Sequence, residues 1–356
     1  MKKLRNFMII FVIIVGVILI GGAFVFNHYT KSMGIDEKVE VTIDSGTSPS
    51  KIGKILYDNG LIRSETFYKL YLKLFNVNNL KAGKYELNKN MSLEEILSKL
   101  KEGNNYNEDE ISLTFREGIN MRSIAKVIAN GTDNTEQAVF DLLKKEDYLK
   151  GLINDYWFIT EDILNKDIYY SLEGYLYPDT YRFNNKQVTV EEIFNKLIKK
   201  MDSVLTPLKE KIEKSRFSTH ELLTLASIAE LESKDREDYR EKIISVFANR
   251  LDKKMSLGSD ITTRYSVKLD DKRALKKSEY ATVNAYNTRS ETMAGKLPAG
   301  PIAMPSSSSI LAVLNYPETD YLYFIANIQT GETFFYSKYS DFEKKKQELS
   351  KVNGNY

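Results

Sequence analysis

The chain has 356 residues, 42% hydrophobic and 28% charged, so it can bury a core and is long enough for more than one folded domain. It contains no cysteine and two histidines, which excludes disulfides, thiolate catalysis, a Ser-His-Asp triad and a multi-histidine metal site. Lys2, Lys3 and Arg5 account for the net charge of +2, and the rest of the chain has 48 of the 51 basic residues against all 49 acidic ones, a balance that excludes a nucleic-acid partner.

The first segment is predicted to be a membrane anchor. Twenty consecutive uncharged, mostly aliphatic residues run from Phe7 to Phe26, and as a helix they span about 30 Å, the thickness of a bilayer core. A cleaved signal peptide is the alternative, but its apolar region is usually about 7–15 residues long and ends in a small-residue cleavage site, which this segment lacks. We therefore predict a cytoplasmic stub and transmembrane anchor over residues 1–30. The basic N-terminus lies inside, and the rest of the chain lies outside the cell membrane.

Residues 38–105 are predicted to form a small α+β module. Val39–Asp44 alternates apolar and polar residues as a strand does, and Gly83–Leu87 has the pattern of a returning strand. Two short amphipathic helices are expected between them, and Ser92 and Glu95 have capping-box spacing at the start of a third. The polar run Glu102–Glu110 marks the domain boundary.

Residues 108–352 are predicted to form a larger α+β domain. It begins with the strand-like ISLTFREG, and Tyr321–Asn327 and Thr333–Ser337 are expected to be paired strands. Apolar periodicity predicts helices over Met121–Ala129, Thr135–Lys145, Val190–Met201, Pro207–Lys214, Ser218–Ser233 and Glu237–Lys253.

The helix over Ser218–Ser233 carries the strongest catalytic candidates. It is apolar around its whole circumference, as a buried helix is, and only Glu230 and Glu232 interrupt its last turns. At 100° per residue these two lie about 200° apart and cannot face the same cleft. Glu230 is preferred because small residues one turn back, such as Ser227, leave room for a ligand. A carboxyl group that emerges from an apolar helix is desolvated, which favours a proton donor; the alternative is two solvated glutamates at a fraying helix end.

Two further segments could shape a binding cleft. LEGYLYPDTYRF, residues Leu172–Phe183, interleaves tyrosines with a turn and two carboxylates, which suits either a sugar-stacking wall or a well-packed turn with its rings in the core. Gly295–Pro305 holds three of the seven prolines, and this rigid loop is either a cleft rim or a crossover.

Taken together, these segments resemble the endolytic murein transglycosylases, the YceG-like (MltG) family, over nearly the whole chain. The resemblance is carried by SGTSPSKIGKILYDNGLI, KAGKYEL, FREGIN, LEGYLYPDTYRF, LASIAELES, SVFANRL, LGSDITTRY, AYNTR, GKLPAGPIAMPS and YLYFIAN, in family order. It implies a LysM-like module over 38–105 and a YceG-like catalytic domain over 108–352. Ile261 and Ala299 stand where the family usually has proline, and Arg289 where an aromatic residue is common, so rim contacts are expected to differ.

The resemblance also implies a site and a reaction. Glu230 takes the position of the family's catalytic glutamate, and no metal or cofactor is expected. The residues expected to line the glycan cleft are Glu173, Tyr175, Tyr177, Asp179, Tyr181, Ser227, Asp260, Tyr286, Asn287 and Thr288. One carboxylate suffices when the C6 hydroxyl of MurNAc attacks its own C1 and leaves a 1,6-anhydro end. The implied partners are nascent peptidoglycan strands, the membrane, and proteins of wall synthesis and division.

Two other functions remain open from the sequence. One is a non-catalytic glycan-binding or division scaffold tethered to the membrane. The other is a muramidase that uses water, which needs a second carboxylate such as Glu173 or Asp179.

Overall fold

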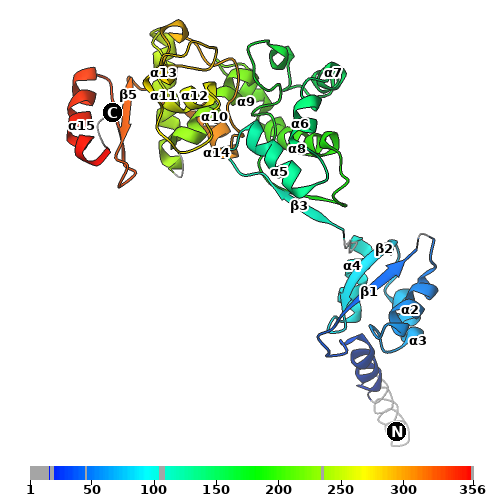
Figure 1. Cartoon of the computed structure of the whole chain (residues 1–356). Coiled ribbons are helices and arrows are strands. Elements are labelled where there is room, and N and C mark those ends of the chain that lie inside the picture. The colour runs from blue at the N-terminus through cyan, green and yellow to red at the C-terminus, as the bar shows by residue number, and fades with distance from the viewer. Residues whose placement is uncertain (1–15, 17–19, 45, 104–108, 234–235, 354–356) are drawn as a thin grey trace, which may run out of the picture. The chain divides into compact units, whose positions relative to one another are not determined.

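The computed structural model describes the chain apart from residues 1–15, 17–19, 45, 104–108, 234–235 and 354–356 (Figure 1). The chain divides into two compact units, a small unit up to Asp109 and a large unit from Glu110 to Tyr356. Each unit combines helices with two-stranded sheets, so the predicted α+β class is confirmed. The division falls within the polar run Glu102–Glu110, while the LysM-like and YceG-like assignments of the two domains stay predictions.

The small unit has the predicted order of strand, two helices, strand and helix. Strands β1 (Lys38–Ile43) and β2 (Gly83–Asn88) pair antiparallel, and the side chains on one face enter the core. Helices α2 (Pro49–Asp58), α3 (Glu65–Leu74) and α4 (Leu93–Glu102) each begin after a serine whose side chain accepts a backbone N–H. The capping box of Ser92 and Glu95 is present at the start of α4, as its spacing predicts.

Most of the predicted membrane span, Phe7–Phe26, lies outside the described residues. Residues 20–30 are helical and pack on the small unit through the rings of Phe26 and Tyr29. Within the described part of the chain, no helix combines the length and apolarity needed to cross a membrane. The anchor therefore stays a prediction.

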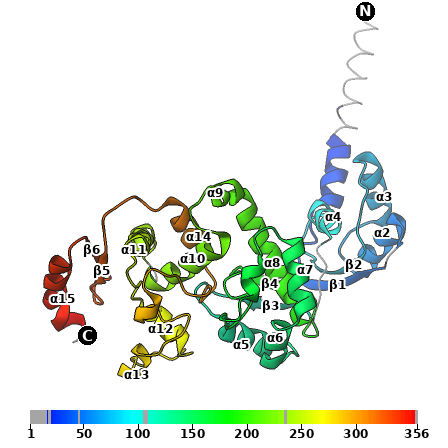
Figure 2. The same cartoon turned by 90° about the horizontal axis from the view of Figure 1, so that it is seen from above.

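The large unit begins with a second antiparallel pair, β3 (Ile111–Thr114) and β4 (Thr180–Phe183). Strand β4 lies inside the segment LEGYLYPDTYRF and was not predicted. The helical elements of this half are α5 (Met121–Gly131), α6 (Glu136–Leu142), α7 (Glu146–Asp155), η1 (Glu161–Leu164), α8 (Val190–Leu205), η2 (Thr206–Leu208) and α9 (Lys209–Glu213). Most of those up to α8 gather at one end of the large unit (Figures 1 and 2), whereas α9 lies beside α14 (Ser307–Asn315).

Helix α10 (Thr219–Ser233) lies in the middle of the large unit, and most of its side chains are buried, as its all-round apolar pattern predicts. It packs against α14, α11 and α12. The elements that follow it in the chain are η3 (Glu237–Tyr239), α11 (Arg240–Asp252), α12 (Asp260–Ser266), α13 (Lys277–Tyr280), η4 (Glu291–Met293) and α14 (Ser307–Asn315).

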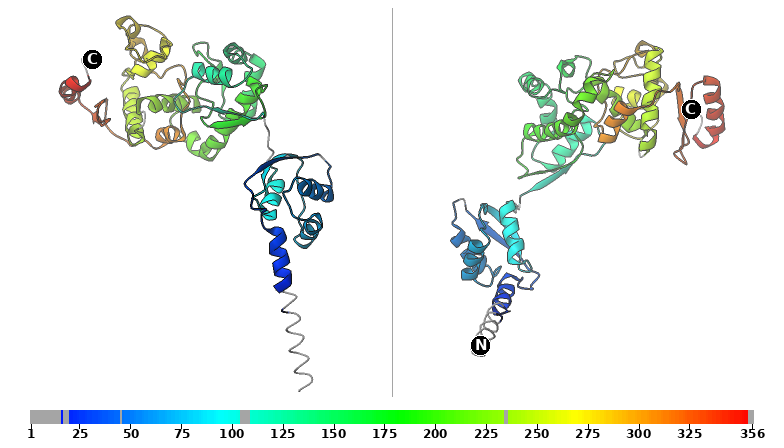
Figure 3. Two further views of the ribbon diagram at one scale, coloured as in Figure 1. Left: turned by 60° about the horizontal axis from the view of Figure 1, so that its bottom comes forward. Right: turned by 180° about the vertical axis from the view of Figure 1, so that it is seen from behind.

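The C-terminal part of the large unit is a small layer of its own. Strands β5 (Tyr323–Ala326) and β6 (Thr333–Tyr336) pair antiparallel, as predicted, and helix α15 (Tyr339–Asn353) packs on both. This layer lies at the opposite end of the large unit from α5–α8 (Figures 1 and 3).

Candidate active site

Helix α10 sends Glu230 and Glu232 to different neighbours, as their angular separation predicts. Glu230 points toward α14 and Arg240, where its oxygens contact Ser306, Ser309 and the guanidinium. Glu232 points toward the start of α12, where it contacts Ser259. The two carboxylates share no hydrogen-bond partner in the described part of the chain, so they have separate roles.

Glu230 sits in a closed cage of donors. Its Oε1 accepts from Nη2 of Arg240 at 2.8 Å, and both side chains are buried. Its Oε2 accepts from the backbone N–H of Ser306 at 2.9 Å and from the hydroxyls of Ser306 and Ser309 at 2.5 and 2.7 Å. Ser306 is the N-cap of α14, so the carboxylate also lies at the positive end of that helix. This surrounding set donates hydrogen bonds to both oxygens of Glu230 and joins α10, α11 and α14.

Glu232 has a different environment. Its side chain is half-buried, and its Oε1 accepts one hydrogen bond, from Oγ of Ser259 at 2.5 Å. Burial of the carboxyl group raises the pKa of Glu232; the hydrogen bond from Ser259 opposes this shift, and the charge of Asp260 adds to it. A carboxyl group that is desolvated and near a second acid can hold a proton to donate at a higher pH than an ordinary glutamate.

Two arginines, Arg289 and Arg250, lie near Glu232, but the guanidinium of each is bonded to another partner. Arg289 pairs with Asp260 across the start of α12, and both remain partly exposed. Arg250 directs its guanidinium to the backbone carbonyls of Leu322 and Leu257, at 2.7 and 2.5 Å. The positive charges of Arg289 and Arg250 favour the ionised form of Glu232 and limit the rise of its pKa. Such a balance suits a group that must both give and take a proton.

Three predicted cleft residues support this site from inside the core. Tyr286, Asn287 and Thr288 are fully buried. Asn287 accepts from Oγ1 of Thr263 at 2.7 Å and donates to the carbonyls of Tyr280 and Thr282. At these positions burial favours support of the α12 segment over direct contact with a glycan. Asp260, by contrast, is partly exposed and available to a ligand.

Thr288 holds the residue that bonds Glu232. Its Oγ1 accepts from the backbone N–H of Ser259 at 3.1 Å and lies 2.6 Å from Oγ1 of Thr262. We expect Thr288→Val to lower the free energy of unfolding by about 1–3 kcal/mol, because the buried N–H of Ser259 loses its acceptor. Urea unfolding measures the change, with Thr288→Ser as the matched control that keeps the hydroxyl. Equal stability of the valine variant and the wild type would contradict this support role.

The LEGYLYPDTYRF segment forms mainly core, not an open aromatic wall. Glu173, Tyr175 and Tyr181 are buried, and Tyr177 is half-buried with its hydroxyl 2.5 Å from Oγ of Ser307. Asp179 is exposed, and its pKa is lowered by the N–H of Thr180 and by Lys200. The well-packed turn, the second reading of this segment, therefore fits most of its residues.

Glu173 is the unusual member of this segment. Its Oε2 accepts from the N–H of Met121 at 3.0 Å and from the hydroxyl of Tyr265 at 2.9 Å, while its Oε1 is buried without a hydrogen-bond partner in the described structure. Burial raises the pKa of Glu173 to about 7, against the hydrogen bonds and the charge of Arg122. Glu173 is in contact with Tyr265 and therefore affects the site through the position of that side chain.

The proline-rich loop joins these parts. Gly174 has φ +78°, and a Cβ there would lie 2.3 Å from Cβ of Pro301, so glycine is required for the close contact of the two segments. Nε2 of His220 lies 2.8 Å from the carbonyl oxygen of Ala299, and its Nδ1 lies 2.7 Å from the hydroxyl of Tyr175. Ser227 accepts from the N–H of Ile302 at 3.0 Å and is fully buried. The small side chain of Ser227 makes room for this loop, which is a packed crossover here.

The hollows of the large unit differ in chemistry. One of about 170 Å³ is lined by Leu231 and Ile261, which neighbour Glu232 and Asp260 in the chain, and by Arg122, Tyr265 and Asp270 among others. Asp179 lines another, of about 450 Å³, with the FREG segment. The first hollow also contains Gly118, where a Cβ would lie 3.9 Å from Cγ of Glu230, so it borders the end of α10 and is the better candidate for a reacting group.

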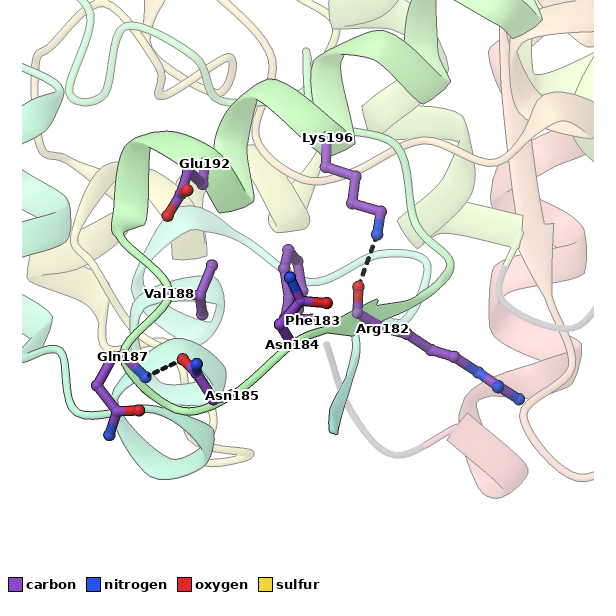
Figure 4. Close-up of a pocket in the computed structure, with 8 residues that line it drawn as sticks. All are labelled: Arg182, Phe183, Asn184, Asn185, Gln187, Val188, Glu192 and Lys196. Atoms are coloured by element: carbon purple, nitrogen blue, oxygen red, sulfur yellow. Dashed lines mark hydrogen bonds between the residues drawn. The ribbon is translucent and has the colours of Figure 1, made fainter. Parts of the chain in front are cut away.

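A hollow of about 450 Å³ at the end of β4 and the start of α8 contains none of the predicted site residues (Figure 4). Lys196 donates there to the carbonyl of Arg182 at 2.6 Å. Its one carboxylate, Glu192, caps α8, and the N–H and hydroxyl of Thr189 lower its pKa. Glu192 therefore cannot serve as a proton donor near neutral pH, and this larger hollow is not the candidate site.

Comparison with known proteins connects the site to a family. The family model described as the YceG-like family matches residues 41–348. An endolytic murein transglycosylase from Bacillus subtilis (strain 168) is 37% identical over 334 residues, covering 93% of this chain and 91% of the relative. One of the same name from Streptococcus pneumoniae (serotype 2, strain D39) is 29% identical and is covered over 65% of its own, longer chain.

A solved structure agrees with the sequence relatives. The crystal structure of a yceG-like protein from Listeria monocytogenes aligns with a TM-score of 0.62 and 34% identity, over 87% of this chain and 99% of that one. Sequence and structure thus match over most of the small and large units together. The chain belongs to the YceG-like family.

Proposed function

We propose that this chain is an endolytic lytic transglycosylase of peptidoglycan. Family membership carries the proposal, since the relative from Bacillus subtilis that matches over most of both chains is named an endolytic murein transglycosylase. The desolvated carboxyl group of Glu232 at the end of α10 supplies chemistry of the kind that this reaction needs. We further propose that the bond cleaved is the one from MurNAc to GlcNAc in nascent strands.

Of the two glutamates, we propose Glu232 as the acid and base. The resemblance by sequence implies Glu230, but the contacts of Glu232 fit a proton donor better. Glu230 accepts hydrogen bonds from four donors, whereas Glu232 accepts one from Ser259 and burial raises its pKa. Glu230 remains the competing candidate, and parallel substitution of both residues decides between them.

The proposed reaction needs one carboxyl group. Protonated Glu232 would give its proton to the glycosidic oxygen as the bond to C1 of MurNAc breaks. The resulting carboxylate would then take the proton of the C6 hydroxyl while that oxygen closes onto C1, which leaves a 1,6-anhydro end. Attack from within the same sugar has a high effective molarity, so no second carboxylate has to activate a nucleophile. Asp260 and Arg289 would orient the sugar beside it.

We also propose that residues 1–30 anchor the protein in the cell membrane, with both units outside and a LysM-like module over residues 38–105. The uncharged run Phe7–Phe26 and the basic residues before it support this topology. An anchor of this kind limits cleavage to strands near the membrane, where they are made. Proteins of wall synthesis and division are then the expected neighbours.

The products of purified glycan strands test the activity. We expect internal cleavage by the full-length protein to give fragments with 1,6-anhydro ends, identified by mass spectrometry. Fragments heavier by one water would instead identify a muramidase, for which Asp260 is the nearby second carboxylate. Intact strands after incubation would leave the scaffold as the better account.

A further inference from the structure

The helix of residues 20–30 packs against α3 of the small unit. The ring of Phe26, the last residue of the apolar run, lies with its centroid 5.9–6.0 Å from those of Phe67, Tyr71 and Phe75. Tyr29 stacks on Phe67 at 5.1 Å. These contacts fix α3 beside the point where the apolar run ends (Figure 1).

The face of α3 next to these rings exposes apolar side chains. Leu70 and Leu74 are 49% and 65% exposed, whereas Tyr68 and Leu72 are buried in the core. Phe75, which follows the helix and contacts Phe26, is 53% exposed at the edge of this face. Lys69 and Lys73 lie on the same exposed stripe, at helical spacing with the leucines. Long lysine side chains beside exposed leucine and phenylalanine are typical of a helix that lies in a membrane interface, because the apolar stems sit among lipid and the charges reach the head groups.

We propose that this α3 face, formed by Leu70, Leu74 and Phe75 with Lys69 and Lys73, rests in the head-group region of the membrane beside the anchor. The proposal depends on the anchor that forms part of the proposed function. If Phe26 marks the end of the membrane span, the rings in contact with it lie at the depth of the interface, and so does the helix that carries them.

Apolar contact, more than charge, accounts for the proposed placement of this face in the membrane interface. Lys69 is already paired with Glu65 at 2.6 Å, and Glu94 of α4 is close enough to influence Tyr71. The attraction to anionic lipids is therefore small. Leu70 and Leu74 are already exposed and can leave water in a bilayer interface, which would hold the small unit against the membrane in one orientation.

The absence of cysteine from the chain allows a clean test. Single variants of the full-length protein in phosphatidylcholine–phosphatidylglycerol nanodiscs would carry a nitroxide at Leu74→Cys, at Phe24→Cys as the anchor reference, or at Tyr57→Cys as the control. Tyr57 lies on α2 of the same unit and is 51% exposed, so it matches Phe75 and Leu70 in exposure. Power-saturation EPR then measures collisions with oxygen, which concentrates in lipid, and with a water-soluble nickel complex.

We expect the label at position 74 to collide several-fold less with nickel than the label at 57, and more with oxygen. A label at 74 as open to nickel as that at 57, with the label at 24 in lipid, would overturn the interface and leave the anchor intact. A label at 24 that is itself in water would overturn the anchor and the interface together. Shielding of position 74 from both reagents would indicate packing against protein and would also overturn the proposal.

Discussion

Glu232→Gln is expected to lower the rate of glycan cleavage by about a hundredfold to ten-thousandfold, the usual contribution of a positioned acid and base. Glutamine cannot supply a proton, but its carbonyl oxygen can still accept the hydrogen bond of Ser259. The variant should therefore keep the stability of the wild type and should still bind strands. Cleavage followed by mass spectrometry, strand binding by co-sedimentation and urea unfolding give the three readings.

Glu230→Gln is the matched variant and is expected to fail in another way. It removes the charge that pairs with Arg240, where both side chains are almost completely buried. Loss of one partner of a buried ion pair costs about 3–5 kcal/mol, because the other charge stays in the core. We expect its unfolding midpoint in urea to fall, and its activity to follow the fraction of folded protein.

The two variants together decide which glutamate reacts. A stable but inactive Glu230→Gln beside an active Glu232→Gln would restore Glu230 as the acid, in agreement with the resemblance. Loss of activity in both, with stability lost only at position 230, supports the assignment to Glu232. Urea unfolding must therefore be measured together with glycan cleavage, because it separates loss of the reacting group from loss of the fold.

The sequence predicted that the glutamates separate, but it could not predict which of them is accessible. Their angle on α10 follows from helix geometry alone, whereas the environment of each depends on segments distant in the chain. Small residues one turn before Glu230 suggested space for a ligand. That space is filled by the proline-rich loop, whose Ile302 N–H bonds Ser227. Periodicity shows where room exists along a helix and not what occupies it.

The order of elements was predicted well where the patterns are local. The small unit and the β5–β6 pair follow from alternation and capping signals, and both have the expected partners. Strand β4 was missed because its four residues directly follow a turn, and its partner β3 lies more than sixty residues earlier. The same long-range packing buried Tyr175, Tyr286 and Asn287, so residues that the resemblance placed along the cleft instead support it.

Glu173 offers the clearest dependence of stability on pH. An acid whose pKa is higher in the folded chain than in the unfolded chain holds its proton more tightly when folded, so its contribution to stability falls as the pH rises. For Glu173 the change runs from the ordinary 4.5 to about 7. A shift of that size corresponds to about 3 kcal/mol. The free energy of unfolding is lower by this amount above neutral pH, where the buried side chain of Glu173 is ionised. The charged or titratable groups that influence it include Tyr265, Tyr286, Arg122 and Asp270.

Glu173→Gln should imitate the protonated side chain at every pH. Its amide oxygen can accept from Met121 N–H and the Tyr265 hydroxyl as Oε2 does, and no charge is left in the core. We expect the variant to match the wild type near pH 4.5 and to exceed it in free energy of unfolding by about 3 kcal/mol at pH 8. Urea unfolding of both proteins at several pH values measures the difference between variant and wild type at each pH. Acids with a lowered pKa, such as Asp270, change the stability of both proteins equally, so their effect cancels in this difference. Glu241→Gln, on an exposed side chain of α11, is the control and should change nothing. An equal pH dependence in Glu173→Gln and the wild type would show that the pKa of Glu173 is the same in the folded and the unfolded chain, which contradicts the effect of burial.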